Sequence, residues 1–426
     1  MVDLYETLSE DQKEVYRNVK ENKINTFVSG QGGHGKSYLA KAMQDKRTVV
    51  AAPTGIAAIN CGGVTIHSAF GLPIGGVTPN DFSIVPKQMS LLFGKGSQVN
   101  QIQFDEMGMI RADYLHLIDM RLRKLKDNNI PFGGIQVTGF GDFFQIEPIL
   151  DASSKEYWDK KTYKSHFCFD SPSWDFKEYE LTTPHRHANH DHVNILRSIR
   201  CKDENFKDAF AELKRISQEY DPSSEATVLC NYNNDADTIN LKKYSQLKGL
   251  ERSYFGKIEG APLKPTETLV PQLIKLKVGA RVIICANDMD KEYVNGDQGV
   301  VVEMDSDCVY VRLDSGITVA VKPFIWEKNE IVNEPISGLT RKTVSSYRQI
   351  PIKLGYAISV HKSQGLTFEN LAIDAGKGSF AHGQFYVSIS RIKNLEKLQF
   401  INKKLLSEKN VIVRQAVIDW YKGVKK

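Results

Sequence analysis

A glycine-rich segment near the amino terminus carries the residue types that bind a nucleoside triphosphate. Residues 30–37 read Gly-Gln-Gly-Gly-His-Gly-Lys-Ser and match the phosphate-loop pattern G-x-x-x-x-G-K-[ST] at every fixed position. Glycines let backbone N–H groups turn towards phosphates, the lysine supplies an ammonium group, and the serine hydroxyl can bind Mg²⁺. The predicted nucleotide-binding residues of this loop are Gly30, Gly32, Gly33, His34, Gly35, Lys36 and Ser37, with Lys36 also catalytic and Ser37 also a magnesium ligand.

The flanks of the loop supply the strand and the helix that such a site requires. The apolar run Thr26 to Val28 precedes it, and Ser37 to Met43 has helical character. The alternative is a glycine-rich turn that matches the pattern by chance. The flanking segments argue against it.

Two further strand ends carry polar residues suited to triphosphate hydrolysis. Residues 101–104 form a short apolar run that ends in Asp105 and Glu106. Asp105 is predicted to hold Mg²⁺ and Glu106 to orient or deprotonate the attacking water. Residues 135–140 predict another strand, and Gln145 in the following loop is a neutral donor that could sense the γ-phosphate.

Gln12 has two interpretations. It lies three residues after Ser9, which predicts a capping box for a first helix. Its amide could instead bond the hydrogen-bonding edges of adenine, so Gln12 is also a candidate nucleotide-binding residue. The capping interpretation is favoured by this stretch alone.

Loops after the predicted strand at 47–52 suggest a surface for nucleic acid. They mix small polar residues with an aromatic residue, a combination suited to phosphate and stacked-base contacts, although an aromatic residue here is more often part of a core. The candidates are Pro53, Thr54, Thr65, His67 and Phe70. The Gly/Pro/Ser-rich span that follows predicts a small insertion or protruding hairpin at about 66–98.

The second half begins with a predicted strand at 227–230 and then changes character. Short strands are predicted at 280–285, 299–303, 309–313 and 317–321, and Asp314-Ser315-Gly316 predicts a tight turn between the last two. This pattern indicates a small β-barrel inserted into an α/β domain.

Composition narrows the class of protein. The 426 residues have a formal net charge of +5, which permits a local basic groove for nucleic acid without requiring one. The six cysteines form no C-x-x-C pair, which argues against a disulfide framework or a zinc module. No window approaches the ~18 apolar residues of a membrane span and the first residues lack a signal-peptide layout. We therefore expect a reduced, cytoplasmic protein with no membrane partner.

Taken together, these motifs carry a family resemblance. The loop at 30–37, Asp105-Glu106-Met107-Gly108-Met109, and the run from Pro131 through Gln136 into Gly141-Asp142-Phe143-Phe144-Gln145 resemble the Pif-type (petite integration frequency) helicases. These form part of the 5′-to-3′ branch of helicase superfamily one, with RecD-like and Dda-like enzymes. The blocks 355–365 and 384–391 are similar to the fifth and sixth motifs of this family.

The resemblance implies an α/β fold with two RecA-like parallel-sheet domains, a small inserted hairpin and an inserted Src-homology-three-like β-barrel. The expected boundaries are 1–175 for the first domain, 176–240 with 345–426 for the second, and 241–344 for the barrel region.

The resemblance also implies functional residues in the second half. Arg186 and Arg391 would contact the γ-phosphate as catalytic residues, beside Lys36, Glu106 and Gln145. Gly365 would lie at the nucleotide, and His361, Ser363 and Gln364 would lie between DNA and nucleotide. The chain departs from the family pattern at His34, Gly108, Glu147 and His187, but none of these changes removes a catalytic side chain. A metal cluster of His185, His187, His190 and His192 is a weaker alternative.

The activity implied is that of an ATP-dependent DNA helicase that uses ATP and Mg²⁺, moves 5′-to-3′ on single-stranded DNA and unwinds forked duplex. A monomer is expected, with replication or repair proteins as partners. Two alternatives stay open: an ATP-gated single-stranded nucleic-acid clamp that does not unwind, and a phosphate-loop kinase.

Overall fold

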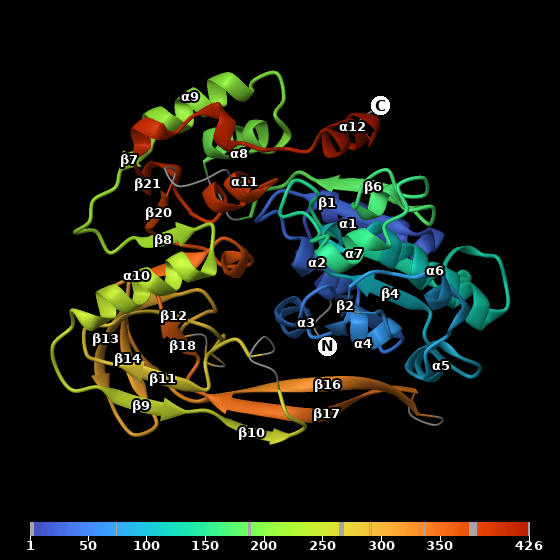
Figure 1. Cartoon of the computed structure of the whole chain (residues 1–426), viewed down its shortest axis with the longest axis horizontal. Helices are drawn as coiled ribbons and strands as arrows, with labels where there is room; N and C mark the ends of the chain where they lie inside the picture. Colours follow the sequence, from blue (N-terminus) through green and yellow to red (C-terminus); the bar gives the residue numbers. More distant parts are fainter. Residues whose placement is uncertain are drawn as a thin grey trace. The chain divides into compact units, whose positions relative to one another are not determined.

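The computed structural model describes residues 4–73, 75–185, 189–263, 268–288, 290, 292–334, 338–374 and 381–424. The chain divides into two compact units, and Figure 1 shows their elements. The first unit comprises Met1–His185, Lys328–Val344 and Gln415–Lys426. The second comprises Arg186–Glu327 and Ser345–Arg414. The main chain therefore passes between the two units four times.

The first unit is built on a six-stranded parallel sheet. Its strand order is β3 (Val64–Thr65), β2 (Thr48–Ala52), β4 (Gln101–Phe104), β5 (Gln136–Phe140), β1 (Thr26–Gly30) and β6 (Lys177–Leu181). All residues of β1, β2 and β4 are buried. Burial of this kind is typical of a parallel sheet covered on both faces.

Eight α-helices accompany this sheet within the described part of the first unit. They are α1 (Glu10–Asn22), α2 (Lys36–Met43), α3 (Gly55–Cys61), α4 (Ile66–Phe70), α5 (Lys87–Phe93), α6 (Ala112–Lys126), α7 (Ala152–Glu156) and α12 (Gln415–Val424). The α1 and α2 helices pack against β1 through Val15, Val19, Val28, Leu39 and Met43. The phosphate loop therefore lies between a buried strand and a helix anchored in the same core.

The span at 66–98 forms short helices rather than the expected hairpin. It contains α4, a 3₁₀ turn at Pro79–Ser83 and α5. The Arg121 guanidinium of α6 is buried and donates to the carbonyl oxygens of Phe70 (3.0 Å), Gly71 (3.0 Å) and Asp81 (3.0 Å). These bonds hold the segment on α6, so the Gly- and Pro-rich composition reflects close packing and not a protruding turn.

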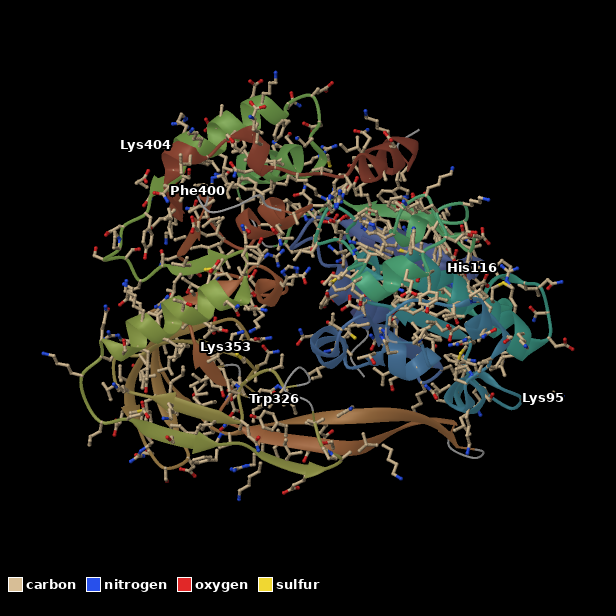
Figure 2. The ribbon with its side chains drawn as sticks, in the orientation of Figure 1. Lys95, His116, Trp326, Lys353, Phe400 and Lys404 are labelled. Atoms are coloured by element: carbon tan, nitrogen blue, oxygen red, sulfur yellow. The ribbon has the colours of Figure 1, made fainter. Side chains whose placement is uncertain are left out.

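The second unit contains a five-stranded parallel sheet and two antiparallel sheets, and one further antiparallel sheet includes residues of both units. The parallel order is β19 (Ala357–Ser359), β8 (Thr227–Cys230), β20 (Leu371–Asp374), β21 (Leu398–Ile401) and β7 (Gln218–Glu219). Its helices are α8 (His190–Cys201), α9 (Phe206–Ile216), α10 (Asn233–Ser245) and α11 (Gln384–Ile389). Phe400 of β21, labelled in Figure 2, stacks on Phe385 of α11 with ring centroids 6.3 Å apart.

The largest antiparallel sheet lies where the barrel was expected. Its order is β15 (Thr318–Val321), β14 (Val309–Leu313), β13 (Gln298–Met304), β12 (Arg281–Ile284) and β18 (Ile352–Leu354). The four predicted short strands are confirmed. Among the described residues, no ladder joins β15 to β18, so closure into a Src-homology-three-like barrel stays a prediction.

Two smaller sheets complete the second half of the chain. β11 (Leu273–Leu276) pairs with β9 (Arg252–Phe255), and β10 (Lys257–Gly260) pairs with β17 (Gly338–Gln349), which neighbours β16 (Phe324–Glu334). Trp326 of β16, labelled in Figure 2, stacks on Tyr347 of β17 at 5.7 Å. The long β16–β17 pair was not predicted.

The division of the chain differs from the expected domain boundaries in three places, one of which is Lys328–Val344, a part of the first unit although 241–344 was expected to form the barrel region. β6 pairs along its whole length with β1, from Thr26 opposite Lys177 to Gly30 opposite Leu181. The first sheet therefore extends beyond residue 175. The helix α12 also belongs to the first unit, whereas 345–426 was assigned to the second domain. The local sequence of β6 does not show that it pairs with β1, and the local sequence of α12 does not show which unit it packs against.

Candidate nucleotide-binding site

The phosphate loop follows β1 and opens directly into α2. Gly35 is the N-cap of α2 and has φ +76°, in the left-handed region that favours glycine. A Cβ at this position would lie 2.3 Å from Nε2 of Gln12. Glycine is therefore required here by both the backbone conformation and the available space.

The ammonium group of Lys36 lies inside the loop. Its Nζ donates to the carbonyl oxygens of Gly30 (2.7 Å) and Gln31 (3.1 Å). These bonds place a positive charge at the start of a helix, where backbone N–H groups also favour anions. The loop thus combines the two features that bind phosphate.

Gln12 contacts the loop and caps α1 at the same time. Its side chain is fully buried. The backbone N–H of Ser9 donates to Oε1 (2.9 Å), and Nε2 donates to the carbonyl of Gly35 (3.1 Å). The predicted capping role is confirmed. Because its amide bonds directly to Gly35 of the phosphate loop, Gln12 also stays a candidate nucleotide-binding residue.

The segment after β6 lies against the same loop. Oδ2 of Asp11 accepts from the N–H groups of Thr182 (2.8 Å) and Thr183 (3.0 Å), and the N–H of His185 donates to the carbonyl of Gly33 (2.9 Å). Burial alone would raise the pKa of Asp11, but the bonds from Ser9, Thr183 and Thr182 outweigh it and lower the pKa to about 2. The ionised carboxylate of Asp11 therefore links α1 to residues 182–183.

The acid pair follows β4, the next strand but one from β1. Burial is the largest influence on Asp105 and raises its pKa, while the backbone of Glu106 and the charge of Lys36 act in the opposite sense. A buried carboxyl near an ammonium group is a suitable oxygen ligand for a hard cation. Glu106 has a left-handed backbone, φ 50° and ψ 42°, a conformation that costs energy in a non-glycine residue.

Gln145 lies in the turn after β5, the strand between β4 and β1. It is 7% exposed. Its Nε2 donates to Oδ2 of Asp142 (3.3 Å), and its N–H donates to the carbonyl of Asp142 (3.1 Å). Since β4, β5 and β1 are neighbours in one parallel sheet, their carboxyl ends meet at one edge. The structure thus brings together Lys36, the acid pair and Gln145.

Asp142 is a functional candidate that the sequence argument missed. Its carboxylate accepts from the N–H of Phe144 (3.1 Å) as well as from the amide of Gln145. Asp142 belongs to the motif Gly141-Asp142-Phe143-Phe144-Gln145, from which only Gln145 is predicted to have a role. Its position three residues before Gln145 was the available signal.

The first-unit residues predicted to contact nucleic acid fall into two groups. Thr54 and Thr65 cap α3 and α4 by accepting from the N–H groups of Ala57 (3.2 Å) and Ser68 (3.2 Å). Pro53 and Thr54 follow β2, and Thr65 is the last residue of the neighbouring strand β3, so all three lie at one sheet edge. His67 is half-buried against Tyr114, and burial lowers its pKa, as does the charge of Arg111.

Phe70 does not belong to this group. Its ring is fully buried and packs on Phe93 at 5.5 Å and on Phe104 at 5.7 Å. It is therefore a core residue, and the predicted base contact is wrong. An aromatic residue in the last turn of α4 points inwards because that face of the helix covers the sheet.

Two further predicted site regions, Arg391 and the residues around His361, belong to the second unit. Arg391 is buried and donates to the carbonyl of Val387 (3.0 Å) and to Oγ of Ser390 (2.9 Å). Gly365 has φ +81° with open space at its Cβ position. Arg186 lies outside the described residues.

The residues after β19 differ in their access to solvent. His361 is exposed as a residue, although partial desolvation of its imidazole lowers its pKa. Ser363 is fully buried and donates to the carbonyl of Val360 (2.8 Å), so its hydroxyl is not available to DNA and that prediction is corrected. Nε2 of Gln364 is buried and has no hydrogen-bond partner in the described part of the chain.

Within the described ranges there is no group of three or more His, Cys, Asp or Glu side chains that could hold a metal ion. His187, one member of the suggested histidine cluster, lies outside those ranges. No described helix is long and apolar enough to cross a bilayer.

This loop at the end of a central strand of a parallel sheet, with an acid pair and a polar turn at the same edge, defines the class of phosphate-loop nucleotide-binding proteins. The sequence model for PIF1-like helicases matches residues 7–207. This chain belongs to the PIF1-like helicase family.

Individual relatives extend the similarity to almost the whole chain. The ATP-dependent DNA helicase PIF1 of Xenopus laevis is 30% identical over 441 residues, which cover 98% of this chain and 65% of that protein. The chain thus spans less than two thirds of that relative. The crystal structure of Bacteroides sp Pif1 with ADP-AlF4 has a TM-score of 0.89 and 31% identity, covering 98% of this chain and 97% of that one. Bacteroides Pif1 bound to single-stranded DNA has a TM-score of 0.67 and 32% identity, with the same coverage.

Proposed function

We propose that this protein is an ATP-dependent DNA helicase that moves 5′-to-3′ along single-stranded DNA and unwinds forked duplex. The observation that carries the proposal is the meeting of Lys36, the acid pair and Gln145 at one edge of the first sheet. Relatives with ADP-AlF4 and with single-stranded DNA support both ligands. The direction of movement rests on family membership.

Within the first unit, each proposed role follows from the position of the side chain. Lys36 and the loop N–H groups bind the phosphates, and Gln145 responds to the γ-phosphate when its amide leaves Asp142. Glu106 holds the attacking water and accepts its proton. Ser37 and Asp105 would hold Mg²⁺, which neutralises phosphate charge when bound.

Residues of the second unit are assigned from the family motifs. Arg391 and Arg186 are the proposed γ-phosphate contacts, with Gly365 beside the nucleotide. A contact of this kind stabilises negative charge on the transferred phosphoryl group and can contribute ~10³–10⁵ in rate.

Residues at or after strand ends, exposed fully or in part, are the proposed contacts to single-stranded DNA. Pro53, Thr54, Thr65 and His67 supply them in the first unit, and His361 with Gln364 in the second. The unpartnered amide nitrogen of Gln364, noted above, is a donor for which a ligand oxygen would be a partner.

ATP hydrolysis tests the nucleotide site directly. We expect single-stranded DNA to stimulate turnover in the native protein, and Lys36→Ala and Glu106→Gln to lower it by at least about a hundredfold. Lys41→Ala is the matched control, because Lys41 is an exposed lysine on the same helix. Full turnover in Lys36→Ala would exclude the proposed site.

Strand separation tests the function. Duplexes with a 5′ tail or a 3′ tail are compared with and without ATP, and only the 5′-tailed duplex should unwind. DNA-stimulated hydrolysis without strand separation would favour the non-unwinding clamp instead.

A further inference from the structure

The last helix of the chain belongs to the first unit, although the chain reaches it from the second. Arg414 is the last residue of the second unit, and α12 begins at the next residue, Gln415. Figure 1 shows α12 beside β6. Val417 on its inner face is fully buried. A helix of 10 residues has little stability in isolation, so α12 depends on this packing.

Trp420 anchors α12 in an aromatic cluster. Its ring packs edge-on against Phe143 at 4.7 Å and stacks on Phe169 at 5.5 Å. Its Nε1 donates to Oε1 of Glu178 (2.9 Å), the same oxygen that accepts from the indole of Trp174 (2.9 Å). The indole is therefore fixed by ring contacts on two sides and by a charged acceptor.

Tyr421, the next residue, contacts the next phenylalanine. Its ring packs edge-on against Phe144 at 5.2 Å and 88°. Its hydroxyl lies 3.1 and 2.9 Å from the two carboxylate oxygens of Glu180 on β6. Two consecutive residues of α12 thus contact two consecutive residues of the turn after β5.

That turn ends at Gln145. Phe143 and Phe144 lie outside every strand and helix, yet both are 1% exposed. No ladder bond fixes this turn, so its position depends on where the two rings pack and on the bonds to Asp142. Contacts from α12 therefore act on the residue that directly precedes Gln145.

We propose that Trp420 and Tyr421 are positioning residues for Gln145. They hold Phe143 and Phe144, and through them they keep the Gln145 amide where it can respond to the γ-phosphate. This inference rests on the proposed ATPase function. It assigns a part in that chemistry to a helix more than two hundred residues away in sequence.

Phe143 has further support within the first unit. Its ring also contacts Phe27 at 4.8 Å, Phe169 at 4.9 Å and Trp174 at 5.8 Å. Loss of the Trp420 ring leaves those contacts in place. Tyr421 contacts Phe144, the residue next to Gln145, whereas Trp420 contacts Phe143, one residue further away. We therefore expect loss of the Tyr421 ring to have the larger effect on Gln145.

The test is a comparison of kcat and KM for DNA-stimulated ATP hydrolysis in the full chain. Tyr421→Leu is expected to lower kcat about tenfold with KM for ATP unchanged, because a misplaced Gln145 loses transition-state contact but the phosphate loop is intact. Trp420→Leu should lower kcat less. Tyr421→Phe keeps the ring on Phe144 and should stay within about twofold of the native protein.

Trp158→Leu is the matched control, since Trp158 is also half-buried and packs on Tyr163.

A double variant separates positioning from general stabilisation. If Tyr421 acts through Gln145, Tyr421→Leu will cause no further loss of kcat in a Gln145→Ala background. Additive losses, a fall equal to that of Trp158→Leu, or a rise in KM at constant kcat would each overturn the inference. An inactive native protein would instead contradict the proposed function, so the two failures are distinguishable. Circular dichroism at the assay temperature confirms that each variant is folded.

Discussion

Gly108 and Asp142 meet backbone to backbone, and at this point the acid pair approaches the turn that carries Gln145. A Cβ at position 108 would lie 3.0 Å from the carbonyl oxygen of Asp142 and 3.2 Å from its carbonyl carbon. Contacts this short force the neighbour to move by a few tenths of an ångström. Asp142 accepts a hydrogen bond from the Gln145 amide. A small side chain at position 108 would therefore displace Asp142 and, through that bond, Gln145.

Gly108→Ala is therefore expected to change turnover more than stability. We expect kcat for ATP to fall by roughly tenfold, with a stability loss near the ~1 kcal/mol lower limit for overpacking. Steady-state kinetics and thermal unfolding measure the two effects. Gly423→Ala is the control, since a Cβ there meets nothing within 4 Å. Unchanged kcat in Gly108→Ala would show that Asp142 does not transmit the contact.

Asp11 predicts a pH dependence of stability. Its folded pKa of about 2 lies below the ordinary value of 3.8, so the folded state favours the ionised form. The stabilisation is present above about pH 4 and is lost as the pH falls towards 2. Asp11→Asn should lower the unfolding midpoint by roughly 2 °C at pH 7, with the difference vanishing near pH 2, because the side chain is partly exposed. Glu14→Gln on the exposed face of α1 is the control.

At the scale of elements, hydrogen bonds around a buried ion pair connect the largest antiparallel sheet to the second parallel sheet. Arg281 of β12 donates to both carboxylate oxygens of Asp314, at 2.5 and 2.6 Å, and to Oε1 of Gln298 (3.2 Å). The same Gln298 oxygen accepts from Thr227 of β8 (2.7 Å). The tight turn predicted at 314–316 thus also holds the carboxylate partner of Arg281, and Gln298 of β13 connects this group to β8.

Loss of one partner of this pair is expected to destabilise the second unit strongly. Asp314→Ala leaves a buried guanidinium without its carboxylate, which costs roughly 3–5 kcal/mol. Glu225→Ala is a matched control. Glu225 also approaches Arg281, at 3.5 Å, but its side chain is 64% exposed, so little change is expected. Chemical denaturation measures both variants, and equal losses would contradict the burial argument.

Elements whose identity depends on local pattern could be predicted, and elements defined by distant partners could not. The strand at 26–28, the acid pair and the capping box at Ser9 are local features, and each lies where the sequence indicates. Phe70 and β6 show the limit. The same aromatic residue suits a core or a base contact, and the sequence does not say that residues 177–181 pair with β1.

The roles of second-unit residues came from the family motifs and not from residue chemistry. A buried arginine such as Arg391, bonded to its own helix, gives no local sign of a phosphate contact. The aromatic residues of α12 gave no signal at all, because Trp420 and Tyr421 acquire their partners only in the folded chain.

For the whole molecule, the net charge of +5 is modest, so DNA affinity should depend on a few local cations. Binding to single strands weakens with salt, with a log–log slope of about −0.7 per phosphate contact. Lys362 is exposed beside His361. Lys362→Ala should make the slope shallower by about 0.7 in fluorescence titrations, whereas Lys243→Ala on α10 should leave it unchanged. Equal slopes in all three proteins would exclude a contact at 361–362.

The return of α12 to the first unit has a consequence for biosynthesis. All six strands of the first sheet have been translated once residue 181 leaves the ribosome, and domains generally fold in that order. The cluster around Phe143 nevertheless lacks Trp420 until residue 420 has been translated. The first unit therefore spends the translation of the entire second unit with an apolar face uncovered.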